Sequence, residues 1–545
     1  MTRRLRPLAT LGIAFGLLAA APAGQDAPFD LLVSGGRLLD GTGNPWRRAD
    51  VGIRGDRIVA VGRLAGHAAA RVVDARDRVV APGFIDAHSH ALESLGAPDL
   101  RDARGLLAQG VTTVIGNPDG GGPVDLAAQA ASLADGGIGI NAALLIGHGS
   151  VRRAVIGSAD RQPTAGDLDR MRALVRQAAA DGAFGLSSGL FYIPGRYARL
   201  EEVIALAREA GGVYTSHIRD EGTYDTGVVA SVDEVIRVAE EAGVRGVVSH
   251  MKALGPDSWG LSREMIAHID AARARGVEVL ADQYPYDASS TSLAAAVMPG
   301  ETARSAEEAL SGTESRTAFL AMVRENIRRR GGPASIVIAS GRGAPGLAGR
   351  RLSEIADARG VSPEQAAADI VVSGTASIVS FNMSDEDIDR IMRQPWTMAS
   401  SDGGLVRPGA GQPHPRSQGA FARRIARYVR DRGVLTLEEA VRTATSLTAA
   451  TFGLTDRGVI REGALADVIV FDPARVQDRA TYEDPFPEAA GIDWVVVNGQ
   501  VARAEGEFTG ARGGRVLRRD HQGTSAGSQS PISSAPCPCA PYAAR

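Results

Sequence analysis

The middle of the chain alternates between short apolar runs typical of strands and amphipathic segments typical of helices. The helical segments carry apolar residues on one face, as in 201–210, 232–242 and 263–275. Repeated strand–helix units predict an α/β fold with a parallel sheet closed as a barrel, over residues 81–454. The segment 290–344 breaks this rhythm and is expected to be a subdomain inserted over the barrel mouth. The strand-like runs cover 110–115, 140–146, 182–186, 212–216, 246–249, 277–282 and 396–400.

Both ends of the barrel region are flanked by short β-type runs interrupted by glycine. These runs lie within 29–80 and again within 455–510, where 458–460, 466–471 and 494–499 are strand-like. We expect the two ends to build one small composite β-sandwich domain. Residues 511–545 lack periodicity and are expected to be a disordered tail.

The first 23 residues have the organisation of a secretory signal peptide. Three arginines precede an apolar stretch over 8–21, and Ala21-Pro22-Ala23 is a small-residue cleavage motif. A membrane anchor is the alternative, but it needs a longer apolar stretch and no cleavage site. We expect export to a periplasm or to the medium, with no membrane contact after cleavage.

Composition excludes several classes of protein. Of the 545 residues, 44% are hydrophobic and 23% are charged, which excludes a chain that is disordered throughout. The net charge is −3 and the body has no basic block, so nucleic acid is not an expected partner. Because Cys537 and Cys539 both lie in the C-terminal tail, the body must use nitrogen and oxygen groups for its chemistry. Lys252 is the single lysine among 60 basic residues, which favours a functional role for its ammonium group.

Four histidines follow predicted strands, and their placement is the main indication of chemistry. His88 and His90 are two residues apart in an extended segment, so both side chains can face one ion. His217 and His250 each end a later run, and Asp402 follows the last one. In an α/β barrel the carboxyl ends of the strands form the catalytic face. The sequence therefore predicts that these five side chains meet.

Imidazole and carboxylate groups without a thiolate favour Zn²⁺ or a related transition ion over Ca²⁺ or Mg²⁺. Such an ion lowers the pKa of a water molecule to about 7 and polarises a carbonyl. A carboxylate beside it can take a proton from water and deliver it to a leaving amine. Asp402 is the natural candidate for this transfer.

The segment 81–90, Ala-Pro-Gly-Phe-Ile-Asp-Ala-His-Ser-His, resembles the first-strand signature of the amidohydrolase superfamily. The segment 463–472 is similar to the superfamily's C-terminal strand motif. The segments 216–222, 249–252, 281–286 and 414–416 narrow the resemblance to the N-acyl-D-amino-acid deacylases, or D-aminoacylases. This resemblance covers roughly 29–502. It implies a distorted (β/α)8 TIM barrel with a flanking β-domain, and zinc-dependent hydrolysis of an N-acyl-D-amino acid to a carboxylate and a free D-amino acid.

The resemblance also implies roles for single residues. His217 and His250 would hold the tighter zinc ion, and His88 and His90 a second or weaker one. Asp402 would be a ligand and the general acid and base. A cation such as Arg416 is suited to bind a free α-carboxylate. The positions that match substrate contacts of the family are Lys252, Tyr192, Tyr284, Ser290 and Arg416, and His148 in a Gly-His-Gly element is expected to line the site.

One segment departs from the family. The deacylases carry Gly-Asn-Cys-Gly after the second strand, where the thiolate ligates zinc, whereas this chain reads Gly116-Asn117-Pro118-Asp119-Gly120. Proline cannot ligate a metal. Asp119 could supply an oxygen ligand if the glycines allow the loop to shift, and the alternative is an ordinary turn residue. The number of zinc ions, one or two, stays open.

Two other functions remain open. A hydantoinase-like cyclic-amide hydrolase or a dipeptidase would share the fold and the first-strand motif, because these do not select the substrate. A secreted, metal-binding but non-catalytic protein is conceivable because the cysteine is missing. Asp402 and the matching site positions argue against this second alternative. No oligomeric state follows from the sequence.

Overall fold

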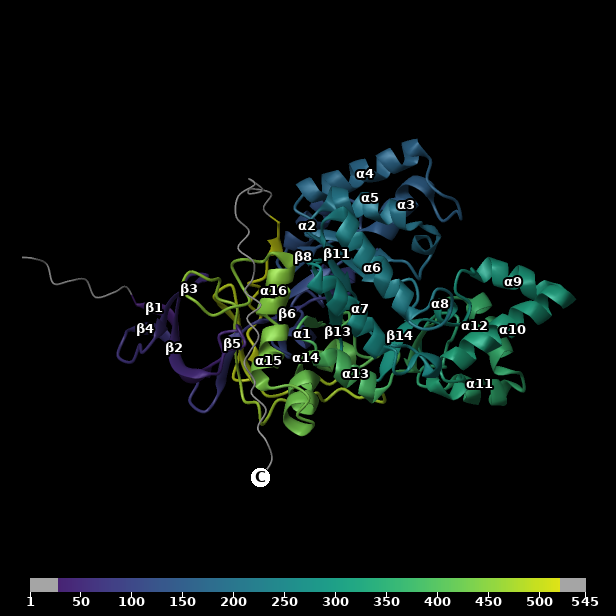
Figure 1. Ribbon diagram of the computed structural model, residues 1–545. Helices are drawn as coiled ribbons and strands as arrows, with labels where there is room; N and C mark the ends of the chain where they lie inside the picture. Colours follow the sequence, from purple (N-terminus) through teal and green to yellow (C-terminus); the bar gives the residue numbers. More distant parts are fainter. Residues whose placement is uncertain (1–27, 520–545) are drawn as a thin grey trace, which may run out of the picture.

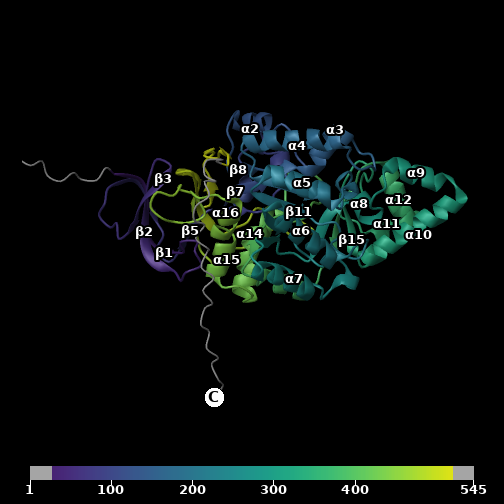
Figure 2. The same ribbon diagram turned by 45° about the horizontal axis from the view of Figure 1, so that its top comes forward.

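A computed structural model describes residues 28–519 of the chain. Figure 1 shows three parts side by side: a β-domain at one end, a barrel in the middle and a helical subdomain around α9 to α12 at the other end. The view turned by 45° keeps this order (Figure 2). The predicted signal peptide lies outside the described residues. Within those residues, no helix combines the length and the apolar character needed to cross a membrane.

Eight parallel strands close into a barrel, which confirms the predicted fold class, with β8 and β9 counted as one broken strand. Neighbouring strands pair in parallel around the barrel. Ala87 N donates to Ala399 O over 3.3 Å and joins the last strand to the first. The strands are β6 (Phe84–Asp86), β7 (Val111–Gly116), β8 (Asn141–Leu144) with β9 (Ile146–Gly147), β10 (Gly185–Gly189), β11 (Val213–His217), β12 (Arg245–Val248), β13 (Val279–Gln283) and β17 (Thr397–Ala399).

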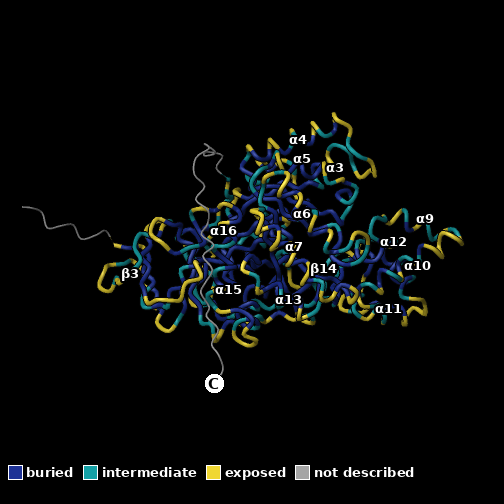
Figure 3. Tube along the Cα trace, viewed as in Figure 1, coloured by how far each residue is buried: buried dark blue, intermediate teal, exposed yellow. Residues whose placement is uncertain are grey.

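Helices cover the outside of the barrel, and several of them are amphipathic. In α6 (Val228–Ala242), the buried residues Val228, Val232, Val235 and Val238 recur at helical spacing. The barrel strands have the helices on one side and the barrel interior on the other, so both of their faces are buried. Figure 3 shows the buried residues at the centre of the molecule. The predicted helices correspond to α5, α6 and α7. Besides α6, the α-helices of this part are α1 (Arg104–Leu107), α2 (Leu126–Ala134), α3 (His148–Ile156), α4 (Ala165–Ala180), α5 (Leu200–Ala210), α7 (Ser262–Ala274), α13 (Asp385–Met392), α14 (Arg416–Arg423), α15 (Leu437–Thr443) and α16 (Ser446–Phe452), and a π-helix spans Arg424–Asp431.

Strands from both chain ends form one nine-stranded sheet beside the barrel. Along β18, Val468 and Val470 face the core of this domain, whereas Ile469 and Phe471 join the barrel core. The sheet therefore packs around its own core and also anchors the barrel. The predicted run 458–460 is not a strand, because Gly458 has a φ of 78° and turns the chain. The strands are β1 (Phe29–Leu38), β2 (Arg47–Arg54), β3 (Arg57–Gly62), β4 (Ala69–Asp74), β5 (Val79–Pro82), β18 (Val468–Phe471), β19 (Ile492–Val497), β20 (Gln500–Ala504) and β21 (Glu507–Phe508).

The inserted subdomain extends over 288–381, beyond the predicted 290–344. Three antiparallel strands, in the order β14, β16, β15, connect it to the barrel. Leu293, Ile336 and Ile378 share one hydrophobic core, so the segment after 344 belongs to the same unit. Its elements are β14 (Ala288–Ser292), α8 (Leu293–Val297), α9 (Ala303–Ser311), α10 (Thr313–Arg329), β15 (Ile336–Ser340), α11 (Leu352–Arg359), α12 (Pro363–Ser373) and β16 (Ser377–Phe381).

The prediction of a disordered tail is wrong for residues 511–519. The short strand β22 (Val516–Leu517) pairs in parallel with β8, opposite Ala142 and Ala143. Arg512 and Arg515 form ion pairs with Asp102 and Asp56. A two-residue strand has no periodicity of its own, and long-range pairing holds it in place. The remainder of the predicted tail, 520–545, lies outside the described residues.

Candidate metal centre and active site

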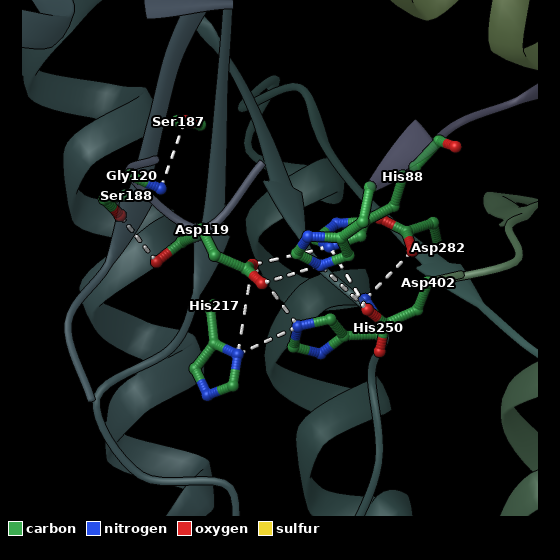
Figure 4. A network of polar contacts seen from close by, with 12 residues as sticks. His88, Asp119, Gly120, Ser187, Ser188, His217, His250, Asp282 and Asp402 are labelled. Atoms are coloured by element: carbon green, nitrogen blue, oxygen red, sulfur yellow. Dashed lines mark hydrogen bonds and ion pairs between the residues drawn. The ribbon is translucent and has the colours of Figure 1, made fainter. Parts of the chain in front are cut away.

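Two groups of ligand-type side chains meet at the carboxyl ends of the barrel strands. Within each group, one ligand atom per residue lies within 4.8 Å of the others. The two groups share Asp119, which lies between the histidines in Figure 4. The histidines and Asp402 are therefore brought together as the sequence predicts. The first group is His88, His90, Asp119 and Asp402, and the second is Asp119, His217 and His250.

The carboxylate of Asp119 reaches both groups from the loop after β7. Asp119 Oδ1 lies 3.4 Å from His88 Nε2 and 3.5 Å from His250 Nε2, and Oδ2 lies 3.3 Å from His90 Nε2. Gly120 follows with a φ of 71°, and a Cβ there would lie only 3.0 Å from a backbone nitrogen of each of two neighbouring segments. A glycine at this position allows the loop to pack closely and to direct Asp119 into the barrel mouth.

Three residues of the cluster have left-handed backbone conformations. The φ angles are 55° for Asp119, 35° for His250 and 48° for Asp402. A residue other than glycine in such a region costs of order 1–3 kcal/mol and persists only where the surrounding structure fixes it. The backbone at these three positions of the barrel mouth is therefore strained, and the surrounding structure holds it in place.

Carboxylates around the cluster orient the imidazoles. His90 Nδ1 lies 2.9 Å from Glu93 Oε1, and His250 Nδ1 lies 3.0 Å from Glu221 Oε1. The backbone N of His250 donates to Asp282 Oδ1 over 2.9 Å. The contacts with Glu93 and Glu221 fix the ring orientations and leave the opposite ring nitrogens facing the cluster, whereas Asp282 holds the backbone of His250.

Sequence reasoning missed Glu221 and Asp282 as parts of the site. Both lie inside segments that carry the family resemblance, and Glu221 comes four residues after His217. Neither comes directly after a predicted strand, which is the position that singled out the histidines. Their role is visible only once β11, β12 and β13 are neighbours in the sheet.

The charges of the carboxylates and imidazoles in the cluster depend on one another. Burial alone would lower the pKa of His90 and of His250, but the neighbouring carboxylates outweigh it and raise the pKa of His90 well above its usual range and that of His250 to about 10. A bound metal ion would take the place of these protons. Burial lowers the pKa of His217 to about 4, which keeps its imidazole neutral. Burial alone would raise the pKa of Asp402, but Arg416, with the imidazoles of His250 and His90, outweighs it and holds that pKa well below its usual range. The neighbouring imidazoles likewise outweigh the effect of burial on Asp119 and hold the pKa of that carboxyl well below its usual range.

The cluster fits a cation. Among the described residues, His88 Nε2 and Asp119 Oδ1 are buried atoms without a hydrogen-bond partner, although they face each other at 3.4 Å. An unsatisfied buried polar atom costs about 1–3 kcal/mol, and a bound ion would satisfy an imidazole nitrogen and a carboxylate oxygen together. A set of nitrogen and oxygen donors without sulfur matches Zn²⁺ or a related transition ion.

A cavity of about 450 Å³ opens beside the cluster. Arg416 Nη1 lies 2.6 Å from Asp402 Oδ2, and Lys252 Nζ pairs with Glu221. The Tyr284 ring lies near both cations, with its centroid 4.8 Å from Arg416 Cζ and 5.6 Å from Lys252 Nζ. The residues predicted to contact substrate that line this cavity are Lys252, Tyr192, Tyr284, Ser290 and Arg416.

The prediction that His148 lines the site is wrong. His148 is the first residue of α3, is fully buried, and is not part of the cavity wall. Its Nε2 lies 2.9 Å from Glu202 Oε1 of α5, and Arg152 binds the same carboxylate. The ring points outward from its strand toward the helix layer, so His148 stabilises the packing of α3 on α5.

Comparison with known proteins agrees with this geometry. A family model described as "Amidohydrolase family" matches residues 309–503. The D-aminoacylase of Alcaligenes xylosoxydans xylosoxydans is 39% identical over 522 residues, which is 90% of this chain and 98% of that protein.

Solved structures give the same relationship. The N-acyl-D-glutamate deacylase of Bordetella bronchiseptica, complexed with zinc and a phosphonate inhibitor, superposes with a TM-score of 0.77 at 36% identity, covering 90% of this chain and 100% of that one. A D-hydantoinase matches with a TM-score of 0.55 at 15% identity, over 90% of this chain and 99% of that one, which shows a shared fold alone. The chain belongs to the amidohydrolases, and within them to the family of N-acyl-D-amino-acid deacylases.

Proposed function

We propose that this enzyme hydrolyses the amide bond of an N-acyl-D-amino acid and releases a carboxylate and a free D-amino acid. The observation that carries the proposal is the position of Asp402, which is ionised, buried and located between the histidine cluster and Arg416. The relatives named above support the choice of substrate, because their names describe D-amino-acid deacylation.

The proposed ligand sets follow the two groups of side chains. His88, His90, Asp119 and Asp402 would hold one ion, and Asp119, His217 and His250 would hold another. Asp119 would thereby take the place of the cysteine that the family carries after the second strand. When bound, zinc supplies polarisation of a carbonyl and a lowered pKa for a water molecule.

Asp402 is the proposed general base and acid. Because its pKa is held well below its usual range, Asp402 is ionised at neutral pH and has a lone pair that can accept a proton from water, and the same carboxylate can return that proton to the leaving nitrogen. Its backbone N donates to His88 O over 2.9 Å, which fixes it against the first strand. The proton therefore moves between groups whose positions the barrel sets in advance.

Three neighbouring side chains are proposed to bind the α-carboxylate of the substrate. Lys252 and Arg416 both provide positive charge near the ring of Tyr284, whose hydroxyl is buried without a partner among the described residues. Each cation has further donor hydrogens beyond its ion pair with Glu221 or Asp402. Tyr192, whose hydroxyl lies 3.1 Å from Thr291 Oγ1, and Ser290 complete the proposed substrate wall.

The experiment is an amine-release assay on the purified mature chain with added Zn²⁺, using matched N-acetyl-D and N-acetyl-L amino acids, hydantoins and dipeptides. D-selective deacylation supports the proposal. Turnover of hydantoins or dipeptides alone would assign the chain to one of those activities. A zinc-loaded protein that is inert to the whole panel would point to a non-catalytic metal-binding role.

Export by an N-terminal signal peptide is also proposed, on the organisation of residues 1–23. The mature enzyme would then act in a periplasm or outside the cell. Fractionation of the cells that produce it, with mass spectrometry of the N-terminus, tests this. Cleavage after Ala23 is expected, and an uncleaved chain in the cytoplasm would contradict it.

A further inference from the structure

The inserted subdomain contributes a buried arginine to the cavity. Arg330 follows α10, is 2% exposed, and lines the cavity together with Lys252 and Arg416. Its segment, between α10 and β15, belongs to the inserted subdomain and not to the barrel. The proposed deacylation does not use this arginine.

The three cations of the cavity differ in their partners. Lys252 is paired with Glu221, and Arg416 is paired with Asp402. Within the described part of the chain, Arg330 forms no ion pair, although it is nearly fully buried. A buried charge without a counter-charge is costly, and such groups are normally paired. The positive charge of Arg330 is therefore available to an anion that enters the cavity.

The known contacts of Arg330 hold its position and are all made to neutral groups. Arg330 Nε donates to Ala296 O over 3.3 Å. With the side-chain amide of Asn382 turned so that its oxygen faces Arg330, this oxygen accepts from Arg330 Nη1 over 3.3 Å. Asn382 in turn contacts Ser289, a hydroxyl residue of the cavity wall. The guanidinium is thus held in place by backbone and amide groups, as in a prepared carboxylate site.

Aromatic rings separate Arg330 from the histidine cluster. The Arg330 guanidinium lies 5.8 Å from the Tyr224 ring, the Tyr224 ring lies 5.6 Å from that of Phe191, and the Phe191 ring lies 5.8 Å from that of His217. The α-carboxylate of a substrate is only one atom removed from the scissile nitrogen. A group that reaches Arg330 must extend further along the substrate.

We propose that Arg330 binds a second carboxylate of the substrate, so that the enzyme prefers N-acyl-D-amino acids that carry an additional acidic group. This inference rests on the proposed function. The carboxylate can come from an acidic amino-acid side chain or from a dicarboxylic acyl group, and both present the same chemistry to the guanidinium.

Matched substrate pairs test the two sources. N-acetyl-D-glutamate against N-acetyl-D-glutamine tests the side chain, and N-succinyl-D-leucine against N-acetyl-D-leucine tests the acyl group. Loss of a charged hydrogen bond corresponds to about tenfold or more in kcat/KM, so we expect the acidic member of one pair to be favoured by at least that factor. Equal kcat/KM within both pairs would overturn the inference, and turnover of the neutral members would leave the proposed function standing.

Variants separate charge recognition from folding. Arg330→Gln should reduce the preference to near one by lowering kcat/KM for the acidic member of the pair, and Arg330→Lys should retain part of the preference. Arg329→Gln is the matched control, because Arg329 is its neighbour, contacts Tyr224 and does not line the cavity. An unchanged preference in Arg330→Gln would contradict the assignment.

A binding measurement keeps the inference testable without turnover. Calorimetry on the wild-type holoenzyme compares D-glutamate with D-glutamine and succinate with succinamate. Tighter binding of the carboxylate member of a pair, lost in Arg330→Gln, supports a carboxylate site even if the chain deacylates nothing. Equal affinities within both pairs would overturn it.

Discussion

At the scale of single residues, the account depends on two carboxylates that are ionised although they are buried. Asp119 and Asp402 are both surrounded by imidazoles, and Asp402 also by Arg416. Their proposed roles differ. Asp119 belongs to both ligand groups, whereas Asp402 also contacts the cation that faces the cavity. Substitution of each should therefore change a different measured property.

Replacement of Asp402 tests the proton transfer. Asp402→Asn keeps the side-chain size but cannot accept the proton, so we expect kcat to fall by at least about 10²-fold. Circular dichroism should show a folded chain at the assay temperature. Asp287→Asn, outside the cavity wall, serves as the control and should retain most of the activity. Near-normal kcat in Asp402→Asn would refute the role of Asp402.

Replacement of Asp119 tests the metal site. Asp119→Asn removes the charge and the anionic oxygen that both groups share, so zinc bound per chain should fall below that of the wild type, together with kcat. The control is Asp125→Asn, because Asp125 caps α2 and asparagine caps a helix equally well. Elemental analysis after gel filtration measures the zinc. Unchanged zinc content in Asp119→Asn would show that Asp119 is only a turn residue.

At the scale of elements, a buried ionic cluster joins α3 to α5. Glu202 accepts from Arg152 and contacts His148. Burial alone would raise the pKa of Glu202, but His148 and Arg152 outweigh it and lower that pKa. Because the folded pKa lies below the unfolded one, the stabilisation is present above the unfolded value of about 4.3 and is lost as the pH falls through the folded pKa.

The substitution Glu202→Gln should therefore destabilise the protein in a pH-dependent manner. Breaking this pair leaves Arg152 buried without a counter-charge, which costs about 3–5 kcal/mol at neutral pH. The difference in Tm from the wild type should narrow below about pH 4.3. Glu209→Gln, which breaks a more exposed pair with Arg176, should cost under about 1 kcal/mol. A Tm difference for Glu202→Gln that does not vary with pH would contradict the assignment.

Local patterns predict individual elements well in this chain. The helix α5 and the strand β11 lie within a residue or two of their predicted bounds, because their periodicity is contained in their own residues. The carboxyl-end rule also predicts that His88, His90, His217 and His250 meet. The orientation of His148 is set by Glu202 on another helix, and local sequence does not encode that contact.

At the scale of the whole molecule, contacts between segments that are distant in the sequence place the residues whose roles the sequence alone does not show. Glu221 becomes a partner of Lys252 and His250 only when β11 and β12 pair. Asp119 reaches the cluster because the loop after β7 packs against β10. The strand β22 likewise depends on pairing with β8, which lies more than 370 residues earlier in the chain.

The pairing of β22 predicts that residues 511–519 stabilise the barrel. A chain of residues 24–510 loses β22, and it also loses the hydrogen bond from Asn498 Nδ2 to Gly513 O and that from Arg515 N to Asn141 Oδ1. At about 1 kcal/mol per hydrogen bond, we expect a loss of at least about 2 kcal/mol relative to the chain 24–519. Thermal unfolding of the two chains measures it. Equal Tm values would show that β22 contributes nothing to stability.

The central claim is that the histidine and aspartate cluster uses a bound metal ion to hydrolyse N-acyl-D-amino acids. The most direct measurement is kcat/KM for N-acetyl-D and N-acetyl-L forms of the same amino acids, with the enzyme stripped of metal and then reloaded with Zn²⁺. The account predicts turnover of the D form that is lost on stripping and restored by zinc. Equal turnover of both forms, or turnover that does not depend on metal, would contradict it.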